Sequence, residues 1–148
     1  TLYRVLLVDD EAPFVESLAS LPWDAHGCGL VGTAFNGEEA LAKCDALMPD
    51  IIITDIAMPL MDGIALMEQV LRRHPDMQFI LLTVHKSFDY ALQAIQAGAV
   101  DYIVKDMHLR SNLPLSLDKA VKHGIIKKNS SVRKKSRAAA MLRKAAAK

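Results

Sequence analysis

Short, continuously apolar segments alternate with longer amphipathic segments along most of the chain. The apolar segments have the length and composition of β-strands: RVLLV (4–8), CGLVGTAF (28–35), IIIT (51–54), QFILLT (78–83) and VDYIV (100–104). Because apolar residues in these segments do not alternate with polar ones, we expect strands that are buried on both faces. Such burial is typical of a parallel sheet covered by helices.

The segments after these strands have apolar positions three or four residues apart, which predicts helices. The first predicted helix runs through Phe14 and Leu18 to Leu21 and is stopped by Pro22. In the second, Asn36 is the expected N-cap.

Proline, serine and glycine mark the bounds of later helices. The third predicted helix ends before Pro75, and Ser87 and Gly98 are expected to begin and end the fourth. A fifth carries Leu113 and Leu117. Five strands alternating with five helices predict an α/β domain with a parallel sheet. Right-handed crossovers place the carboxyl ends of all five strands at one edge, where ligand sites of such sheets lie.

Charge divides the chain into two parts. Through Asp118 there are 17 acidic and 7 basic residues, whereas from Lys119 onward there are 11 basic residues and no acidic one. We therefore expect a domain over 1–124 and a basic extension over 125–148. The extension is too short to form a complete helix-turn-helix reader. A linker or helical extension, a segment foreign to the protein and a DNA-binding arm remain alternative interpretations.

Composition excludes several classes of protein. No apolar run approaches the roughly 20 residues of a membrane span, so no membrane association is expected. The two cysteines, Cys28 and Cys44, form no disulfide framework and lack metal-ligand spacing. We expect a cytoplasmic protein.

Polar side chains that follow the strands carry the candidate chemistry. They are Asp9, Asp10 and Glu11 after the first strand, Asp55 after the third, Thr83 after the fourth and Lys105 after the fifth. Carboxylates that converge on one site need a counter-ion, and oxygen ligands suit Mg²⁺. A carboxylate beside Mg²⁺, with a hydroxyl and an ammonium group to hold incoming oxygens, can attack a phosphoryl group.

Four separated motifs carry a family resemblance. LLVDDE, PDIIITDIAMPLMDG, FILLT and GAVDYIVK resemble, in order and spacing, the receiver domains of bacterial two-component response regulators, over about residues 3–122. The resemblance implies a flavodoxin-like (βα)₅ three-layer sandwich with strand order 2-1-3-4-5. It also implies a phosphoacceptor domain that modifies itself and is otherwise not an enzyme.

The resemblance also implies a role for individual residues. Asp55 would accept phosphate from a phosphohistidine of a sensor histidine kinase. Asp10 and Asp55 would bind Mg²⁺ directly, together with the Ala57 carbonyl, and Asp9 would bind it through water. Thr83 would then bind a phosphoryl oxygen.

The resemblance further places a charge partner and a switch. Lys105 would neutralise the phosphoryl group, and Tyr102 would turn inward when Thr83 moves. The face of the fourth helix, fifth strand and fifth helix would then mediate homodimerisation or contact an output domain. Two positions depart from the family pattern: Asp106 stands where proline usually follows the lysine, and Val84 stands where a small residue is usual. We expect a trans peptide before Asp106, a narrower site beside Val84 and slow phosphoryl exchange.

Two segments indicate a subfamily. LPWDAHGCGLVGTAFNGEEAL and SFDYALQAIQAGAVDYIVK resemble receivers joined to AraC-type helix-turn-helix domains. The expected output is therefore transcriptional, and DNA would be bound only by an output domain that this sequence does not contain.

Two other functions are alternatives to a phosphoacceptor. A phosphatase with an aspartyl-phosphate intermediate typically carries a second acid two residues after the nucleophile, where this chain has Ala57. A degenerate receiver would act as an interaction module without phosphate. The set Asp9, Asp10, Asp55, Thr83 and Lys105 argues against it, while Val84 and Asp106 leave it open.

Overall fold

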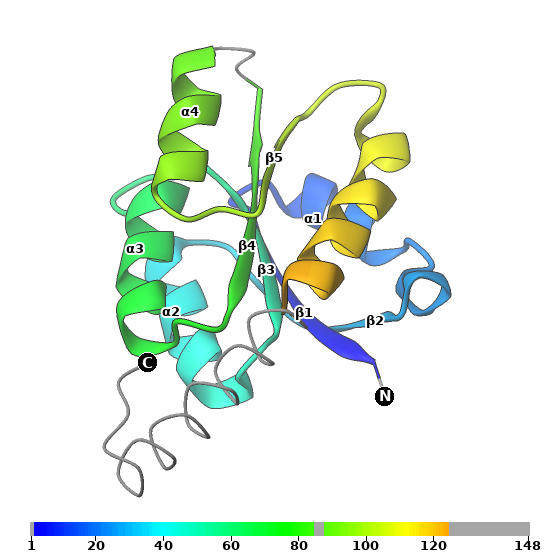
Figure 1. The fold of residues 1–148 in the computed structure, drawn as a ribbon, viewed down its shortest axis with the longest axis horizontal. Coiled ribbons are helices and arrows are strands. Elements are labelled where there is room, and N and C mark those ends of the chain that lie inside the picture. The colour runs from blue at the N-terminus through cyan, green and yellow to red at the C-terminus, as the bar shows by residue number, and fades with distance from the viewer. Residues whose placement is uncertain (1, 85–87, 125–148) are drawn as a thin grey trace, which may run out of the picture.

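A five-stranded parallel sheet forms the centre of the molecule. The computed structural model describes residues 2–84 and 88–124. The strands are β1 (Tyr3–Val8), β2 (Cys28–Ala34), β3 (Ile51–Asp55), β4 (Gln78–Thr83) and β5 (Asp101–Val104). Their order is β2-β1-β3-β4-β5, so the predicted α/β fold and strand order are confirmed (Figure 1).

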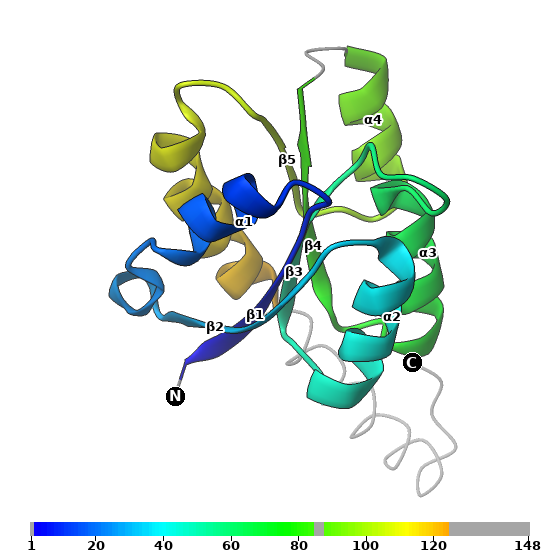
Figure 2. The same cartoon turned by 180° about the vertical axis from the view of Figure 1, so that it is seen from behind.

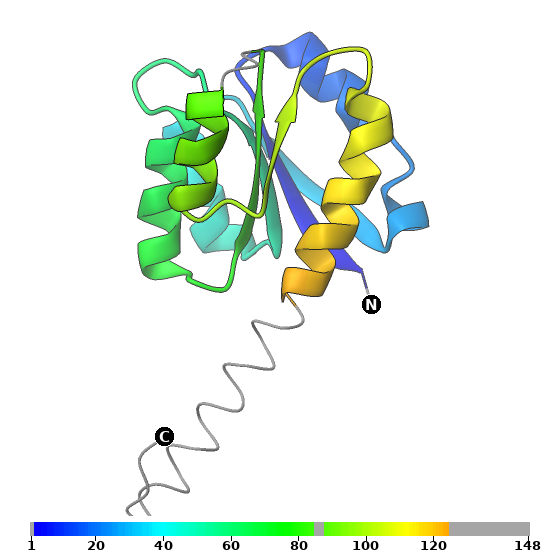
Figure 3. The same cartoon turned by 45° about the horizontal axis from the view of Figure 1, so that its top comes forward.

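Helices cover both faces of this sheet. On one face lie α2 (Gly37–Leu47), α3 (Gly63–Arg73) and α4 (Phe88–Gln96). On the other lie α1 (Ala12–Ala19) and a helix over residues 109–124 (Figures 2 and 3). Because each strand is covered on both sides, its apolar residues need not alternate with polar ones.

Two apolar clusters, one on each side of the sheet, form the core. Leu6, Ile52 and Phe79 point toward α2, α3 and α4, where Leu66 and Met67 pack against them. In the other cluster, residues of the strands pack against Val15 and Leu18 of α1 and against the 109–124 helix, including Leu113 and Leu117. The predicted apolar stripes of these helices therefore face the sheet.

The helix ends follow the sequence signals only in part. Asn36 caps α2, as predicted, and accepts a hydrogen bond of 2.7 Å from the Glu39 N–H. The sequence predicted that the first helix would run to Leu21. In the structure it ends at Ala19, so this bound was wrong. A 3₁₀ helix, η1 (Trp23–His26), follows it. The predicted Ser87 cap and the 125–148 extension lie outside the described residues.

The register of the sheet brings the carboxyl ends of the strands level with one another. Val8 pairs with Thr54, Asp55 with Leu82, and Thr83 with Val104. Residues that leave β1, β3, β4 and β5 therefore emerge at one edge, which is at the top in Figure 1. Within residues 2–84 and 88–124, no helix is both long and apolar enough to cross a membrane.

Candidate functional site

Asp9 leaves β1 as a fully buried carboxylate. Its N–H donates to the Ala34 carbonyl at 3.0 Å, which continues the pairing of β1 with β2 by one residue. Its Oδ1 accepts a hydrogen bond of 2.9 Å from the N–H of Glu11. Backbone hydrogen bonds therefore hold the main chain of Asp9 and orient its carboxylate.

Asp55 is the last residue of β3 and is 5% exposed. The backbone N–H of Ala57 donates a hydrogen bond to its carboxylate. Gly63, the first residue of α3, packs against its main chain: a Cβ at Gly63 would lie 2.2 Å from the Asp55 carbonyl oxygen. The start of α3 thus approaches the end of β3 as closely as only glycine permits.

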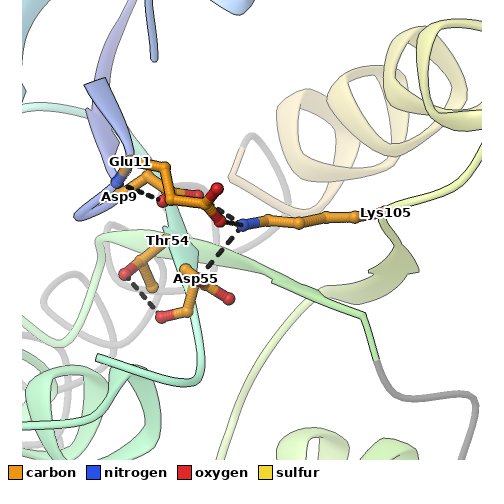
Figure 4. A network of polar contacts seen from close by, with 5 residues as sticks. All are labelled: Asp9, Glu11, Thr54, Asp55 and Lys105. Atoms are coloured by element: carbon orange, nitrogen blue, oxygen red, sulfur yellow. Dashed lines mark hydrogen bonds and ion pairs between the residues drawn. The ribbon is translucent and has the colours of Figure 1, made fainter. Parts of the chain in front are cut away.

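Lys105 joins the two buried carboxylates. Its N–H donates to the Thr83 carbonyl at 2.7 Å, which holds the end of β5 beside β4. Its Nζ lies 2.6 Å from Asp9 Oδ2 and 3.1 Å from Asp55 Oδ2. Figure 4 shows the side chain reaching across the strand ends between the two acids.

Burial and charge both affect the acid–base properties of this trio. Burial raises the pKa of Asp55 above its usual 3.8, although the Lys105 ammonium acts in the opposite direction. For Lys105, burial alone would lower the pKa. The hydrogen bond that Nζ donates to Asp9 and the charge of Asp55 outweigh burial, so the pKa of Lys105 lies above 10.5. The ammonium is therefore charged at neutral pH.

Three carboxylates lie close enough together to hold a hard cation. Oxygens of Asp9, Glu11 and Asp55 lie within 4.8 Å of one another. Oxygen donors and a net negative charge are the chemistry that Mg²⁺ prefers, so this donor set fits the ion. Glu11 is one of the polar residues that follow the first strand, but the family resemblance did not assign it as a ligand.

The other two expected ligands, Asp10 and Ala57, are exposed residues outside this group of three carboxylates. Asp10 is exposed and does not belong to the group of three. It lines a hollow of about 440 Å³ with Asn36 and Pro59. The Ala57 residue is exposed next to the site, where its N–H contacts Asp55.

The two expected switch residues lie on neighbouring strands. Thr83 is buried at the end of β4. Tyr102 of β5 is partly buried and packs against the cluster on the α2–α4 side of the sheet. The structure thus places Thr83 at the site edge and Tyr102 on the face that leads toward α4.

The two departures from the family pattern do not block the site in this conformation. Val84 is 64% exposed, so most of its side chain faces solvent. The peptide before Asp106 is trans, as predicted. The Asp106 carboxylate accepts a hydrogen bond of 2.8 Å from the His108 N–H, in the turn that precedes the 109–124 helix. The Asp106 carboxylate therefore caps this turn through its contact with the backbone.

Comparison with curated proteins identifies relatives of the chain. The transcriptional regulatory protein YesN of Bacillus subtilis is 39% identical over 105 residues, which are 70% of this chain and 28% of YesN. The DNA-binding transcriptional regulator NtrC of Salmonella typhimurium is 41% identical over 124 residues, which are 80% of this chain and 25% of NtrC. The chain thus spans about a quarter of the length of these relatives.

Solved structures of response regulator receiver domains are also similar to this chain. A response regulator receiver domain protein from Clostridium thermocellum superimposes with a TM-score of 0.75 at 26% identity, covering 84% of this chain and 98% of that one. The receiver domain of AraT, a response regulator from Geobacillus stearothermophilus, has a TM-score of 0.71 at 28% identity, covering 88% and 99%.

The family model of the response regulator receiver domain matches residues 5–113, which include Asp9, Asp55 and Lys105. With the strand order and the site at the carboxyl edge, this match shows that the chain belongs to the response regulator receiver domain family.

Proposed function

We propose that Asp55 accepts a phosphoryl group from the phosphohistidine of a sensor histidine kinase. The observation that carries this proposal is the buried Asp9–Lys105–Asp55 arrangement, with Nζ at 2.6 and 3.1 Å from the two carboxylates. Two carboxylates in a buried site repel an incoming phosphoryl group unless cations oppose their charge. One fixed cation, Lys105, is already in place.

The chemistry uses a carboxylate oxygen of Asp55 as the nucleophile. It attacks phosphorus, the bond from phosphorus to the imidazole nitrogen breaks, and an acyl phosphate forms on Asp55. Lys105 then has a phosphoryl oxygen available as a partner. Positioning and charge neutralisation contribute most of the rate in such transfers.

We propose Mg²⁺ as the cofactor, held by Asp9 and Asp55 with Glu11 or Asp10 as a further oxygen ligand and the Ala57 carbonyl beside them. The ion supplies positive charge against the phosphoryl oxygens. Contacts with the Lys105 ammonium orient the carboxylates of both Asp9 and Asp55. The Asp9 carboxylate is oriented further by the hydrogen bond from the Glu11 N–H.

Phosphorylation is proposed to act on the rest of the molecule through Thr83 and Tyr102. Thr83 binds a phosphoryl oxygen, and Tyr102 follows it inward, which shifts an existing equilibrium of the face formed by α4, β5 and the 109–124 helix. Exposed Leu92, Ile95 and Leu115 lie on the two helices of this face. It is the proposed site of homodimerisation or of contact with an output domain.

Transcriptional regulation is the proposed output. YesN and NtrC are named as transcriptional regulators, and both are much longer than this chain. A protein-glutamate methylesterase/protein-glutamine glutaminase of Geobacillus kaustophilus is also 34% identical over 116 residues. Some relatives of this chain are therefore named as enzymes. We propose that this chain catalyses only its own phosphorylation and slow dephosphorylation, in the cytoplasm, and that DNA is bound by a separate output domain.

Incubation with acetyl phosphate and Mg²⁺, followed by intact-mass measurement, tests the proposal. The wild type is expected to gain the mass of one phosphoryl group, and the Asp55→Asn variant is expected to gain none. Omission of Mg²⁺ should abolish the gain in wild type.

Other outcomes distinguish the alternatives. A wild type that never gains the mass would favour a phosphorylation-independent interaction module. Rapid consumption of many equivalents of acetyl phosphate, without accumulation of the adduct, would favour a phosphatase.

A further inference from the structure

The aromatic ring of Phe14 faces the ammonium group of Lys105. The Lys105 Nζ lies over the ring, 4.3 Å from its centroid. No role in the proposed chemistry has been given to Phe14, which lies on α1 and follows none of the strand ends directly. Its ring is nevertheless only slightly farther from the ammonium nitrogen than the Glu11 carboxylate, whose Oε1 lies at 3.9 Å.

The surroundings of the ammonium explain why this contact matters. Asp9 and Asp55 accept hydrogen bonds from Nζ, and the Lys105 side chain is only 7% exposed. Glu11 lies further away, with its Oε1 at 3.9 Å and its side chain 67% exposed. The ammonium is therefore bounded by two buried acids, one exposed acid and the face of the ring.

Phe14 is itself held firmly enough to position a charge. It is partly buried and packs against the apolar cluster that contains Val15 and Leu18. Its N–H donates to the Glu11 carbonyl at 3.1 Å, in a first turn that also contains proline. The backbone bond thus holds the main chain of Phe14, and packing against the core holds its side chain.

We propose that Phe14 is a positioning residue for phosphoryl transfer, which keeps the Lys105 ammonium over its ring and directed at Asp55. This inference rests on the proposed function of Asp55. The face of an aromatic ring is electron-rich and attracts a cation, most strongly when the cation is shielded from water. An aliphatic side chain fills the same space without that attraction.

The need for such a residue follows from the reaction itself. When the phosphoryl group arrives, Lys105 must leave or share its carboxylate partners and accept a phosphoryl oxygen. Its flexible four-carbon stem also permits a move outward, toward the exposed carboxylate of Glu11. The ring favours the inner position, so the ammonium meets the phosphoryl group without a search through other conformations.

Nuclear magnetic resonance tests the contact in the unphosphorylated full chain. Protons over the face of a ring are shielded, so the ε-methylene protons of Lys105 should resonate upfield of ordinary lysine values. The upfield shift is expected to disappear in Phe14→Leu and to remain in Phe14→Tyr. An unshifted wild-type signal would overturn the proposal.

Phosphorylation rates test the positioning role. With acetyl phosphate and Mg²⁺, Phe14→Leu should react about three- to ten-fold more slowly than wild type, a range set by the strength of a cation–π contact. Phe14→Tyr should react within about two-fold of wild type, because it retains the π face. Urea unfolding of each variant checks that the fold is retained.

A double-mutant cycle separates positioning from packing. In a Lys105→Met background, Phe14→Leu should cause no further loss of rate, since no ammonium remains to be positioned. Equal slowing by Leu and Tyr, or a Phe14→Leu effect that persists without Lys105, would overturn the proposal. A wild type that forms no Asp55-dependent adduct would instead overturn the proposed function, and the lysine resonances would still report on the contact.

Discussion

Lys105 meets Asp9 and Asp55 because all three leave parallel strands at the same edge, which is why this part of the site could be predicted from the sequence. Asp10 and Glu11 could not be told apart in the same way. After Val8 the chain leaves the strand, and Asp9 accepts a hydrogen bond from the Glu11 N–H, so Asp9 and Glu11 lie together while Asp10 lines the hollow beside Asn36. The contact of Phe14 with Lys105 depends on how α1 packs and leaves no motif in the sequence.

The raised pKa of Asp55 gives a prediction about stability. In the folded chain, burial raises the pKa above the usual 3.8, so folding favours the protonated, neutral carboxyl. That contribution is fully present below pH 3.8 and is lost as pH rises through the folded pKa. Without Mg²⁺ at neutral pH, the neutral Asp55→Asn variant should therefore unfold at an equal or higher urea concentration than wild type.

The pH dependence provides the control for this prediction. The advantage of Asp55→Asn should shrink as pH is lowered toward 3.8, because the wild-type carboxyl then becomes protonated. A variant less stable than wild type at neutral pH would show that the attraction of Lys105 for Asp55 exceeds the effect of burial.

At the scale of elements, the strands were predictable and some helix ends were not. A strand buried on both faces has to be continuously apolar, and all five strands were located within a few residues. The end of α1 depends on the packing of η1, whose Trp23 is buried, and no local signal before Pro22 marks it. Asp62 caps α3 by accepting a hydrogen bond of 2.7 Å from the Ala65 N–H.

The join between β3 and α3 gives a prediction at this scale. In Gly63→Ala, the new Cβ would lie 2.2 Å from the Asp55 carbonyl oxygen, so either α3 or the end of β3 has to move. We expect a loss of roughly 2–3 kcal/mol in the free energy of unfolding, typical of overpacking, together with slower phosphorylation. Urea unfolding and intact mass measure the two effects.

Gly32→Ala is the matched control for Gly63→Ala. Its Cβ would also meet an atom at 2.9 Å, but this atom is Leu47 Cδ1, the end of a flexible side chain that can turn away. This variant should lose less stability and should phosphorylate at close to the wild-type rate. Equal losses from both variants would contradict the close approach of α3 to Asp55.

At the scale of the whole molecule, the alternation of strands and helices was enough to predict a parallel sheet covered by helices on both faces. The strand order was implied by the family resemblance. Which exposed surface meets a partner depends on side chains that the pattern does not distinguish. Leu115 on the 109–124 helix is 66% exposed. It borders a hollow of about 370 Å³ with Tyr102 and Val104 of β5.

The proposed dimer gives a prediction that uses this residue. Phosphorylated wild type should sediment as a larger species than unphosphorylated wild type, and Leu115→Asp should remain monomeric, because the new charge would be buried in the contact. Leu60→Asp is the control, since Leu60 is fully exposed in the loop between β3 and α3. Identical sedimentation of both phosphorylated variants would contradict a dimer through this face.

The central claim is that Asp55 itself carries the phosphoryl group. Reduction of the phosphorylated chain with borohydride converts an aspartyl phosphate into homoserine, and peptide mapping then locates the modified residue. The account predicts homoserine at position 55 after treatment with acetyl phosphate and Mg²⁺, and none without treatment. Homoserine at Asp9 or Asp10, or unmodified aspartate at all three positions, would contradict it.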